Sequence, residues 1–122
     1  MRLVHAALWV SDLDRSLAFY EALGMEAGLS YARDGVENVY VGDGEESLQL
    51  KHDPDREREI APDRTAVDHV SFAVEDLDAT VDAAVEAGGS IVTAPTHVAE
   101  ADSAFAFVAD PDGHTLEFIE GL

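Results

Sequence analysis

Apolar and polar residues alternate along the chain in a way that predicts short strands interrupted by two helices. Residues 3–10 (LVHAALWV) and 67–74 (VDHVSFAV) are rich in Val and aromatic residues and have the length of a strand. Residues 12–24 and 76–89 begin with an Asp that can cap a helix, continue with apolar residues at helical spacing and end on Gly. Five further strands are expected, at residues 37–42, 47–52, 90–94, 104–109 and 115–120.

The chain also contains an internal repeat. The segment HAALWVSDLD at residues 5–14 corresponds to HVSFAVEDLD at residues 69–78, with the His, Val, Asp, Leu and Asp positions in common. Further along, GDGEESLQL at residues 42–50 corresponds to DPDGHTLEF at residues 110–118, and both consist of a polar turn followed by a strand. A duplicated unit explains this better than chance. Each copy is expected to fold as a strand, a helix and three strands.

The repeat defines the organisation of the chain. Module one is expected at residues 1–52 and module two at residues 67–122. Residues 53–66 (DPDREREIAPDRTA) contain two prolines and show no apolar period, so they are predicted to link the modules.

Four polar residues occupy unusual positions in the predicted strands: His5, Gln49, His69 and Glu117. Strand side chains alternate between the two faces of a sheet, so each of the four is expected to point away from the helix-covered face. Taken singly, such a residue usually just finds a hydrogen-bond partner or faces solvent. All four lie at equivalent positions of the two modules, however, and two imidazoles, a carboxylate and an amide oxygen suit Zn, Ni, Co, Mn or Fe. The pattern therefore predicts a divalent metal site.

Length and composition limit the class of protein. A chain of 122 residues suggests one domain, and 47% hydrophobic residues are enough for a core. No apolar run approaches the length of a membrane helix, and the start of the chain lacks the features of a signal peptide. The absence of cysteine excludes disulfides, thiolate nucleophiles and sulfur-ligated metals. A soluble, cytoplasmic protein is expected.

The charge is far from balanced. Asp and Glu total 26 and Lys and Arg total 7, giving a net charge of −19. Such a field repels nucleic acid and anionic membranes, so neither is expected as a partner. Simple solubility or a cationic ligand would also fit the acidity. We favour adaptation to high salt (halophilic adaptation), where screening removes the repulsion among carboxylates.

Three segments make the sequence recognisable: residues 1–25 (MRLVHAALWVSDLDRSLAFYEALGM), 68–78 (DHVSFAVEDLD) and 107–120 (FVADPDGHTLEFIE). The chain resembles the vicinal oxygen chelate superfamily, which includes glyoxalase I, methylmalonyl-CoA epimerase, extradiol dioxygenases, fosfomycin-resistance transferases and bleomycin-binding proteins. The first segment is similar to bacterial glyoxalase I. The resemblance implies an α+β fold in one domain, residues 1–122, whose modules form a curved eight-stranded mixed sheet with the helices on its outer face.

The resemblance also implies how the site is built. His5, Gln49, His69 and Glu117 stand where the metal ligands of the family stand. In many small members the modules exchange across a homodimer, so that each metal is held by two chains, and the same is expected here. The implied reaction is a glyoxalase-I-like isomerisation of the hemithioacetal of a 2-oxoaldehyde such as methylglyoxal. Glu117 would be the catalytic base, Ni, Co, Zn or Mn the metal, and a small thiol the cosubstrate.

Gln49 is a departure from bacterial glyoxalase I, which carries a glutamate at this position. The order His, Gln, His, Glu matches the methylmalonyl-CoA epimerases, so an epimerase-like reaction stays open. An extradiol-type dioxygenase would need Fe(II) or Mn(II), a phenolic substrate, and only His5, His69 and Glu117 as ligands. A non-catalytic binder of the bleomycin-resistance type would need no metal. Fosfomycin transfer is disfavoured, because no Lys or Arg follows Glu117 and basic residues are scarce.

The acidic composition leads to a prediction about stability. We expect the free energy of unfolding to be larger in molar salt than in dilute buffer, because salt screens the repulsion among the carboxylates. Urea unfolding at low and at high salt concentration measures the difference. A protein that is most stable in dilute buffer would contradict high-salt adaptation.

Overall fold

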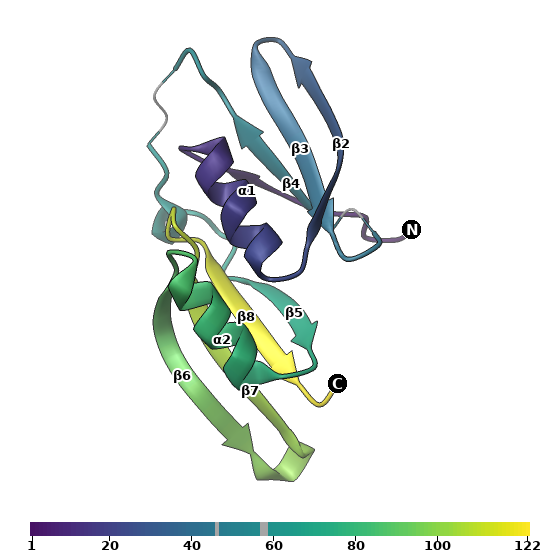
Figure 1. Ribbon diagram of the computed structural model, residues 1–122, viewed down its shortest axis with the longest axis vertical. Helices are drawn as coiled ribbons and strands as arrows, with labels where there is room; N and C mark the ends of the chain where they lie inside the picture. Colours follow the sequence, from purple (N-terminus) through teal and green to yellow (C-terminus); the bar gives the residue numbers. More distant parts are fainter. Residues whose placement is uncertain (46, 57–58) are drawn as a thin grey trace. The chain divides into compact units, whose positions relative to one another are not determined.

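The computed structural model describes residues 1–45, 47–56 and 59–122 of the chain. These residues form two compact units, Met1–Ile60 and Ala61–Leu122, and each unit has one α-helix and four strands in the order βαβββ (Figure 1). The predicted α+β fold of two repeated βαβββ modules is therefore confirmed. The eight strands pair as two four-stranded mixed sheets, one in each unit.

The first unit is built around a single amphipathic helix. Its elements are β1 (Ala6–Trp9), α1 (Leu13–Ala22), β2 (Glu26–Arg33), β3 (Val36–Gly42) and β4 (Leu48–His52). The strands lie in the order β1-β4-β3-β2, with β1 parallel to β4 and the other pairs antiparallel. The helix contributes the fully buried Phe19 and Tyr20, and β4 contributes the fully buried Leu48 and Leu50.

The second unit repeats this topology. Its elements are β5 (Val70–Val74), α2 (Leu77–Glu86), β6 (Ser90–Val98), β7 (Ser103–Ala109) and β8 (Thr115–Glu120), with short 3-10 helices η1 (Pro62–Arg64) and η2 (Ala99–Ala101). The strand order is β5-β8-β7-β6, with β5 parallel to β8 and the other pairs antiparallel. The helix α2 packs on β6, β7 and β8, and the core of this unit includes Val81 and Ala84 of the helix and Leu116 and Phe118 of β8.

Both helices begin and end where the sequence predicts. Asp12 and Asp76 are the N-caps, and the side chain of each accepts a hydrogen bond at 3.0 Å from the backbone N–H three residues later. Gly24 and Gly88 follow the helices with φ of +91° and +105°. A residue with a Cβ is strained in this left-handed conformation, which explains why glycine ends both helices.

Some strand boundaries differ from the sequence-based expectation. The first strand of each unit is shorter than residues 3–10 and 67–74, because pairing with the last strand starts at Ala6 and at Val70. His5 and His69 therefore immediately precede a strand. The strand β6 runs to Val98, beyond the predicted residue 94, since Pro95 is tolerated in an edge strand.

The sequence pattern did not predict the strand β2 (Glu26–Arg33). It lies at the edge of the first sheet, and all eight of its residues are exposed. An exposed edge strand buries neither face, so it needs no alternation of apolar and polar residues. The sequence therefore carried no periodic signal for it.

Each sheet has one face covered by its helix and one face that the helix does not cover. We call the uncovered face the open face. On the first sheet it carries Trp9, Asn38, Tyr40, Gln49 and Lys51, and on the second it carries Ser71, Phe105, Phe107 and Glu117. The predicted direction of Gln49 and Glu117, away from the helices, is therefore confirmed within each unit.

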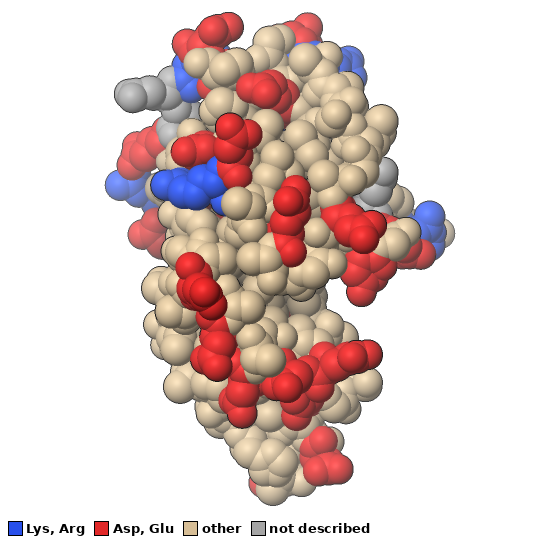
Figure 2. Space-filling view, in the orientation of Figure 1, with Lys and Arg blue, Asp and Glu red and all other residues tan. Residues whose placement is uncertain are grey.

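The surface of the chain is strongly acidic. Figure 2 shows Asp and Glu side chains spread over the visible face of both units, with Lys and Arg at few places. Neither α-helix of the described ranges is long and apolar enough to cross a membrane.

Candidate functional site

Gln49 lies at the centre of a buried polar network in the first unit. It is 7% exposed, and its neighbours in β4, Leu48 and Leu50, face the helix. Its Nε2 donates a hydrogen bond of 2.8 Å to Oδ1 of Asn38 in β3. The same Oδ1 accepts a second bond of 2.8 Å from Nζ of Lys51. The sheet thus holds the side chain of Gln49 in place instead of leaving it solvated.

His5 lies on the same open face, just before β1. The backbone N–H of the next residue, Ala6, donates to the carbonyl of Ser47 at 3.1 Å, which ties this part of the chain to the start of β4. The His5 ring meets the ring of Tyr40 edge-on, with 5.0 Å between centroids. Tyr40 is also the register partner of Gln49 across β3 and β4. The two predicted ligands of the first unit therefore share Tyr40 as a neighbour.

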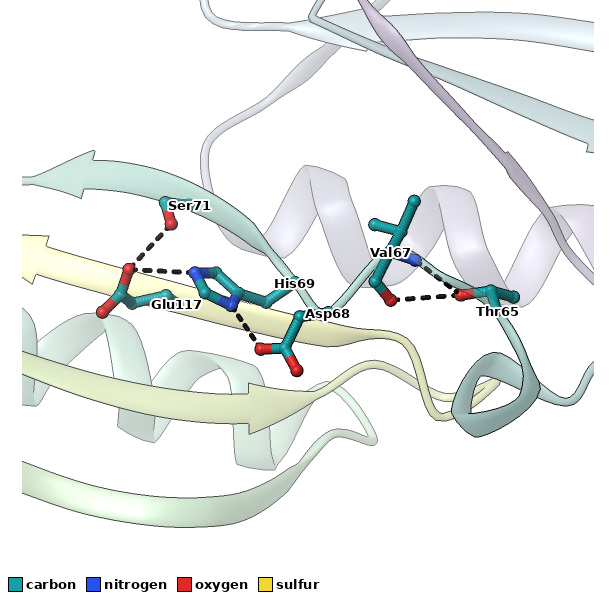
Figure 3. Close-up of polar contacts among 6 residues, drawn as sticks. All are labelled: Thr65, Val67, Asp68, His69, Ser71 and Glu117. Atoms are coloured by element: carbon teal, nitrogen blue, oxygen red, sulfur yellow. Dashed lines mark hydrogen bonds and ion pairs between the residues drawn. The ribbon is translucent and has the colours of Figure 1, made fainter.

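His69 and Glu117 are in direct contact in the second unit (Figure 3). The Nε2 atom of His69 lies 3.4 Å from Oε1 of Glu117, and its Nδ1 atom lies 2.7 Å from Oδ2 of Asp68. Ser71, the register partner of Glu117, donates its hydroxyl to the same Oε1 at 2.7 Å. The His69 ring also meets the ring of Phe107 edge-on, with 5.2 Å between centroids. The imidazole is thus held by two carboxylates and an aromatic ring.

Each unit brings its two predicted site residues onto one open face. Sequence reasoning missed the supporting residues Asn38, Lys51, Asp68 and Ser71. Face parity could have identified Ser71, two residues after His69, but the partners of Gln49 depend on the register between β3 and β4. In the described ranges, neither unit gathers three or more His, Asp or Glu side chains in an arrangement that could hold a metal ion.

The chemistry available on the two open faces is complementary. The second unit offers an imidazole nitrogen and a carboxylate, which can bind a cation or take up a proton. The first unit offers an imidazole, which can also bind a cation or take up a proton, and a neutral amide, whose oxygen can bind a cation but cannot act as a base. Glu117 is therefore the one predicted site residue that combines negative charge with basicity.

The chain belongs to the glyoxalase/bleomycin resistance protein/dioxygenase superfamily, whose family model matches residues 2–118. It is 33% identical to a lactoylglutathione lyase of Haemophilus influenzae, over 98% of this chain and 93% of that protein. It is also 32% identical to the metallothiol transferase FosB of Shouchella clausii, over 96% of this chain and 78% of that protein. Proteins similar to it along its length are thus named as enzymes of two kinds.

Solved structures of the same family share the fold. The structure of glyoxalase I from Zea mays superposes with a TM-score of 0.82 at 28% identity, covering 97% of this chain and 44% of that one. The trypanothione-dependent glyoxalase I of Leishmania major gives a TM-score of 0.74 at 28% identity, covering 98% of this chain and 86% of that one. The predicted resemblance to the vicinal oxygen chelate superfamily is therefore confirmed.

The contacts of His69 predict which ring nitrogen carries the proton when the ring is neutral. We expect the proton on Nδ1, because Asp68 accepts at 2.7 Å there while Glu117 lies 3.4 Å from Nε2. Long-range ¹H–¹⁵N NMR spectra at alkaline pH distinguish the two tautomers. Asp68→Ala should move the proton to Nε2, where Glu117 becomes the remaining acceptor.

A matched control for this experiment is Asp63→Ala, which removes an exposed carboxylate from η1. It should leave the tautomer of His69 unchanged. A wild-type spectrum with the proton on Nε2 would show that the contact with Asp68 does not orient the ring.

Proposed function

We propose that the protein is a divalent-metal-dependent lyase of the glyoxalase I type. Its substrate would be the hemithioacetal formed from a small thiol and a 2-oxoaldehyde such as methylglyoxal. The observation that carries this proposal is the contact of 3.4 Å between His69 and Glu117 on an open face. The same chain is 33% identical to a lactoylglutathione lyase over 98% of its length.

The proposed metal ligands are His5, Gln49, His69 and Glu117, two from each unit. Their donors are two imidazole nitrogens, one amide oxygen and one carboxylate oxygen, which suit Zn, Ni, Co or Mn. The hydrogen bonds fit this role. Nε2 of Gln49 is engaged with Asn38, which leaves Oε1 for a cation, and Nδ1 of His69 is engaged with Asp68, which leaves Nε2. We propose that the two units act as one domain over residues 1–122.

The chemistry follows from the difference between the four side chains. A bound divalent ion supplies Lewis-acid stabilisation of the negative charge that develops on the substrate oxygens. Glu117, loosened from the metal, would remove the proton from the carbon that bears the thiol sulfur and return it to the neighbouring carbon. Ser71 donates to Oε1 of Glu117, which leaves Oε2 available to take up the proton. The isomerisation breaks one C–H bond and forms another, the hydroxyl proton passes from one substrate oxygen to the other, and no oxidant is needed.

Exposed apolar side chains support the proposal of a homodimer with sites shared between chains. Large apolar residues are at least 42% exposed near the N-terminus, on β2, before β5 and on β6: Met1, Leu3, Val4, Leu29, Tyr31, Val67, Ile91 and Val92. Exposed apolar side chains of this kind gain stability when a second copy of the chain removes them from water. Light scattering at high salt is expected to give the mass of two chains. A monomer with full activity would contradict sites shared between chains.

The substitution Glu117→Gln tests the proposed function. The amide keeps an oxygen that can bind a metal but cannot accept the substrate proton, so turnover should fall by about 10²- to 10⁴-fold with the metal retained. The assay is the isomerisation of methylglyoxal mixed with a panel of thiols, combined with elemental analysis of the same preparation. Turnover near that of the wild type would rule out Glu117 as the base.

A matched control lies on the same strand. Glu120 in β8 accepts a hydrogen bond of 2.9 Å from the backbone N–H of Leu77 at the start of α2. Glu120→Gln keeps an acceptor oxygen there, so turnover should stay close to that of the wild type. A loss of activity in both variants would indicate general damage to β8.

The same preparation distinguishes the other chemistries of the superfamily. Bound iron with uptake of oxygen would point to a dioxygenase, and turnover of a thioester without a 2-oxoaldehyde would point to an epimerase. A wild-type protein that binds no Ni, Co, Zn or Mn would contradict the metal-dependent lyase and favour a non-catalytic binder. The similarity to a metallothiol transferase supports the choice of a thiol panel.

A further inference from the structure

Asn38 links two donors on the open face of the first sheet. It is 2% exposed, and its Oδ1 accepts one hydrogen bond from Gln49 and one from Lys51, each 2.8 Å long. Its Nδ2 donates at 3.0 Å to the backbone carbonyl of Val36. All the polar atoms of the Asn38 side chain are thus engaged, at a position that the solvent hardly reaches.

The partners of Asn38 leave one orientation for its amide. The ammonium group of Lys51 can only donate and the carbonyl of Val36 can only accept. Oδ1 must therefore face Lys51 and Nδ2 must face Val36. With the opposite orientation Asn38 would direct its NH₂ at an ammonium group and its oxygen at a carbonyl, which leaves buried polar groups unpaired.

The orientation of Asn38 in turn determines that of Gln49. Because Oδ1 is an acceptor, Gln49 must present its NH₂ to Asn38. The opposite rotamer of the Gln49 amide would bring two oxygens together in a site where Gln49 is 7% exposed. The Oε1 atom of Gln49 is consequently directed away from Asn38.

We propose that Asn38, itself oriented by Lys51 and Val36, is a positioning residue that presents the amide oxygen of Gln49 to a divalent metal ion. This inference rests on the proposed role of Gln49 as a ligand. An amide offers either an oxygen or an NH₂ group, and only the oxygen binds a cation. A metal site with a glutamine ligand therefore needs a neighbour that selects the oxygen, whereas a glutamate ligand does not.

Lys51 is suited to orient the side chain of Asn38. It is the single lysine of the sequence, although the chain carries 26 acidic residues. In the described part of the chain its ammonium group contacts Oδ1 of Asn38 and lies 5.5 Å from the centre of the Trp9 ring, with no carboxylate partner. A carboxylate beside Lys51 would compete with Asn38 for the ammonium group. Among the described residues no carboxylate does so, and Lys51 donates to Asn38 instead.

The second unit has a glutamate at the position equivalent to Gln49, and it lacks the counterparts of Asn38 and Lys51. By strand register, Phe105 and Ile119 take the places of Asn38 and Lys51 beside Glu117. Glu117 is instead supported by Ser71, whose counterpart in the first unit is Ala7. A carboxylate needs a donor and the NH₂ of an amide needs an acceptor. Each module supplies the supporting group that its own proposed ligand requires.

The experiment measures metal affinity and the Gln49 amide, neither of which depends on catalysis. Asn38→Leu removes the acceptor, and we expect it to weaken binding of Zn or Co about 10- to 100-fold, as loss of a group that orients a ligand does. Competition with a chromophoric chelator gives the dissociation constant. Asn38→Asp still accepts from both Gln49 and Lys51 but loses the hydrogen bond to Val36, so its affinity should stay closer to that of the wild type than the affinity of Asn38→Leu.

Two further measurements keep the test independent of folding defects. In metal-free wild-type protein, the side-chain NH₂ of Gln49 should exchange slowly with solvent, and in Asn38→Leu or Asn38→Ala it should exchange quickly. The matched control is Glu37→Gln, which changes the adjacent residue of β3, whose carboxylate pairs with His52 at 3.2 Å. This control should bind metal as the wild type does.

The outcomes separate this inference from the proposed function. Wild-type affinity in Asn38→Leu, or rapid exchange of the Gln49 amide in the wild type, would overturn the positioning role and leave the lyase proposal standing. Weakened binding in Asn38→Leu, in a protein without activity on any hemithioacetal, would support the positioning role and refute the lyase. A wild-type protein that binds no divalent metal would overturn both.

Discussion

The parallel pairing of the first and last strands of each module is the constraint on which both parts of the candidate site depend. β1 lies beside β4 with Ala7 opposite Gln49, and β5 lies beside β8 with Ser71 opposite Glu117. Side chains that are register partners share a face, so this pairing brings the polar residues of two distant segments onto the open face. A slip of one residue would turn Gln49 or Glu117 toward the helix and bury it unpaired.

The two modules use one scaffold for different polar chemistry. Both have the same strand order, the same Asp cap and the same glycine stop, which satisfy the backbone and the core. The side chains of the open faces take no part in the helix caps or the glycine stops, so they can differ between the two modules. One therefore holds a neutral amide in a buried network, and the other holds a more exposed imidazole–carboxylate pair with a hydroxyl donor. The two modules thus share one topology, and each provides half of the proposed ligand chemistry.

Charge acts at two scales in this molecule. The net charge of −19 creates a long-range field that attracts cations to the protein without holding them at a particular place. Retention of a cation requires ligand atoms with fixed directions. Hydrogen bonds such as those of Gln49 with Asn38 and of His69 with Asp68 give the proposed ligands such directions. The acidic surface therefore contributes to the attraction of cations, and the candidate site contributes to their retention. Mutation of a surface carboxylate changes the first effect without removing a proposed ligand.

The sequence by itself determined the fold class, the repeat, both helices with their caps, and the direction of Gln49 and Glu117. These features depend on local propensity and on the two-residue period of a strand, which a sequence displays directly. The tertiary structure decided that β2 exists, because an exposed edge strand has no apolar period. It also decided which groups support the site. Asn38 reaches Gln49, and Ser71 reaches Glu117, across strands whose register comes from the packed sheet and not from either segment alone.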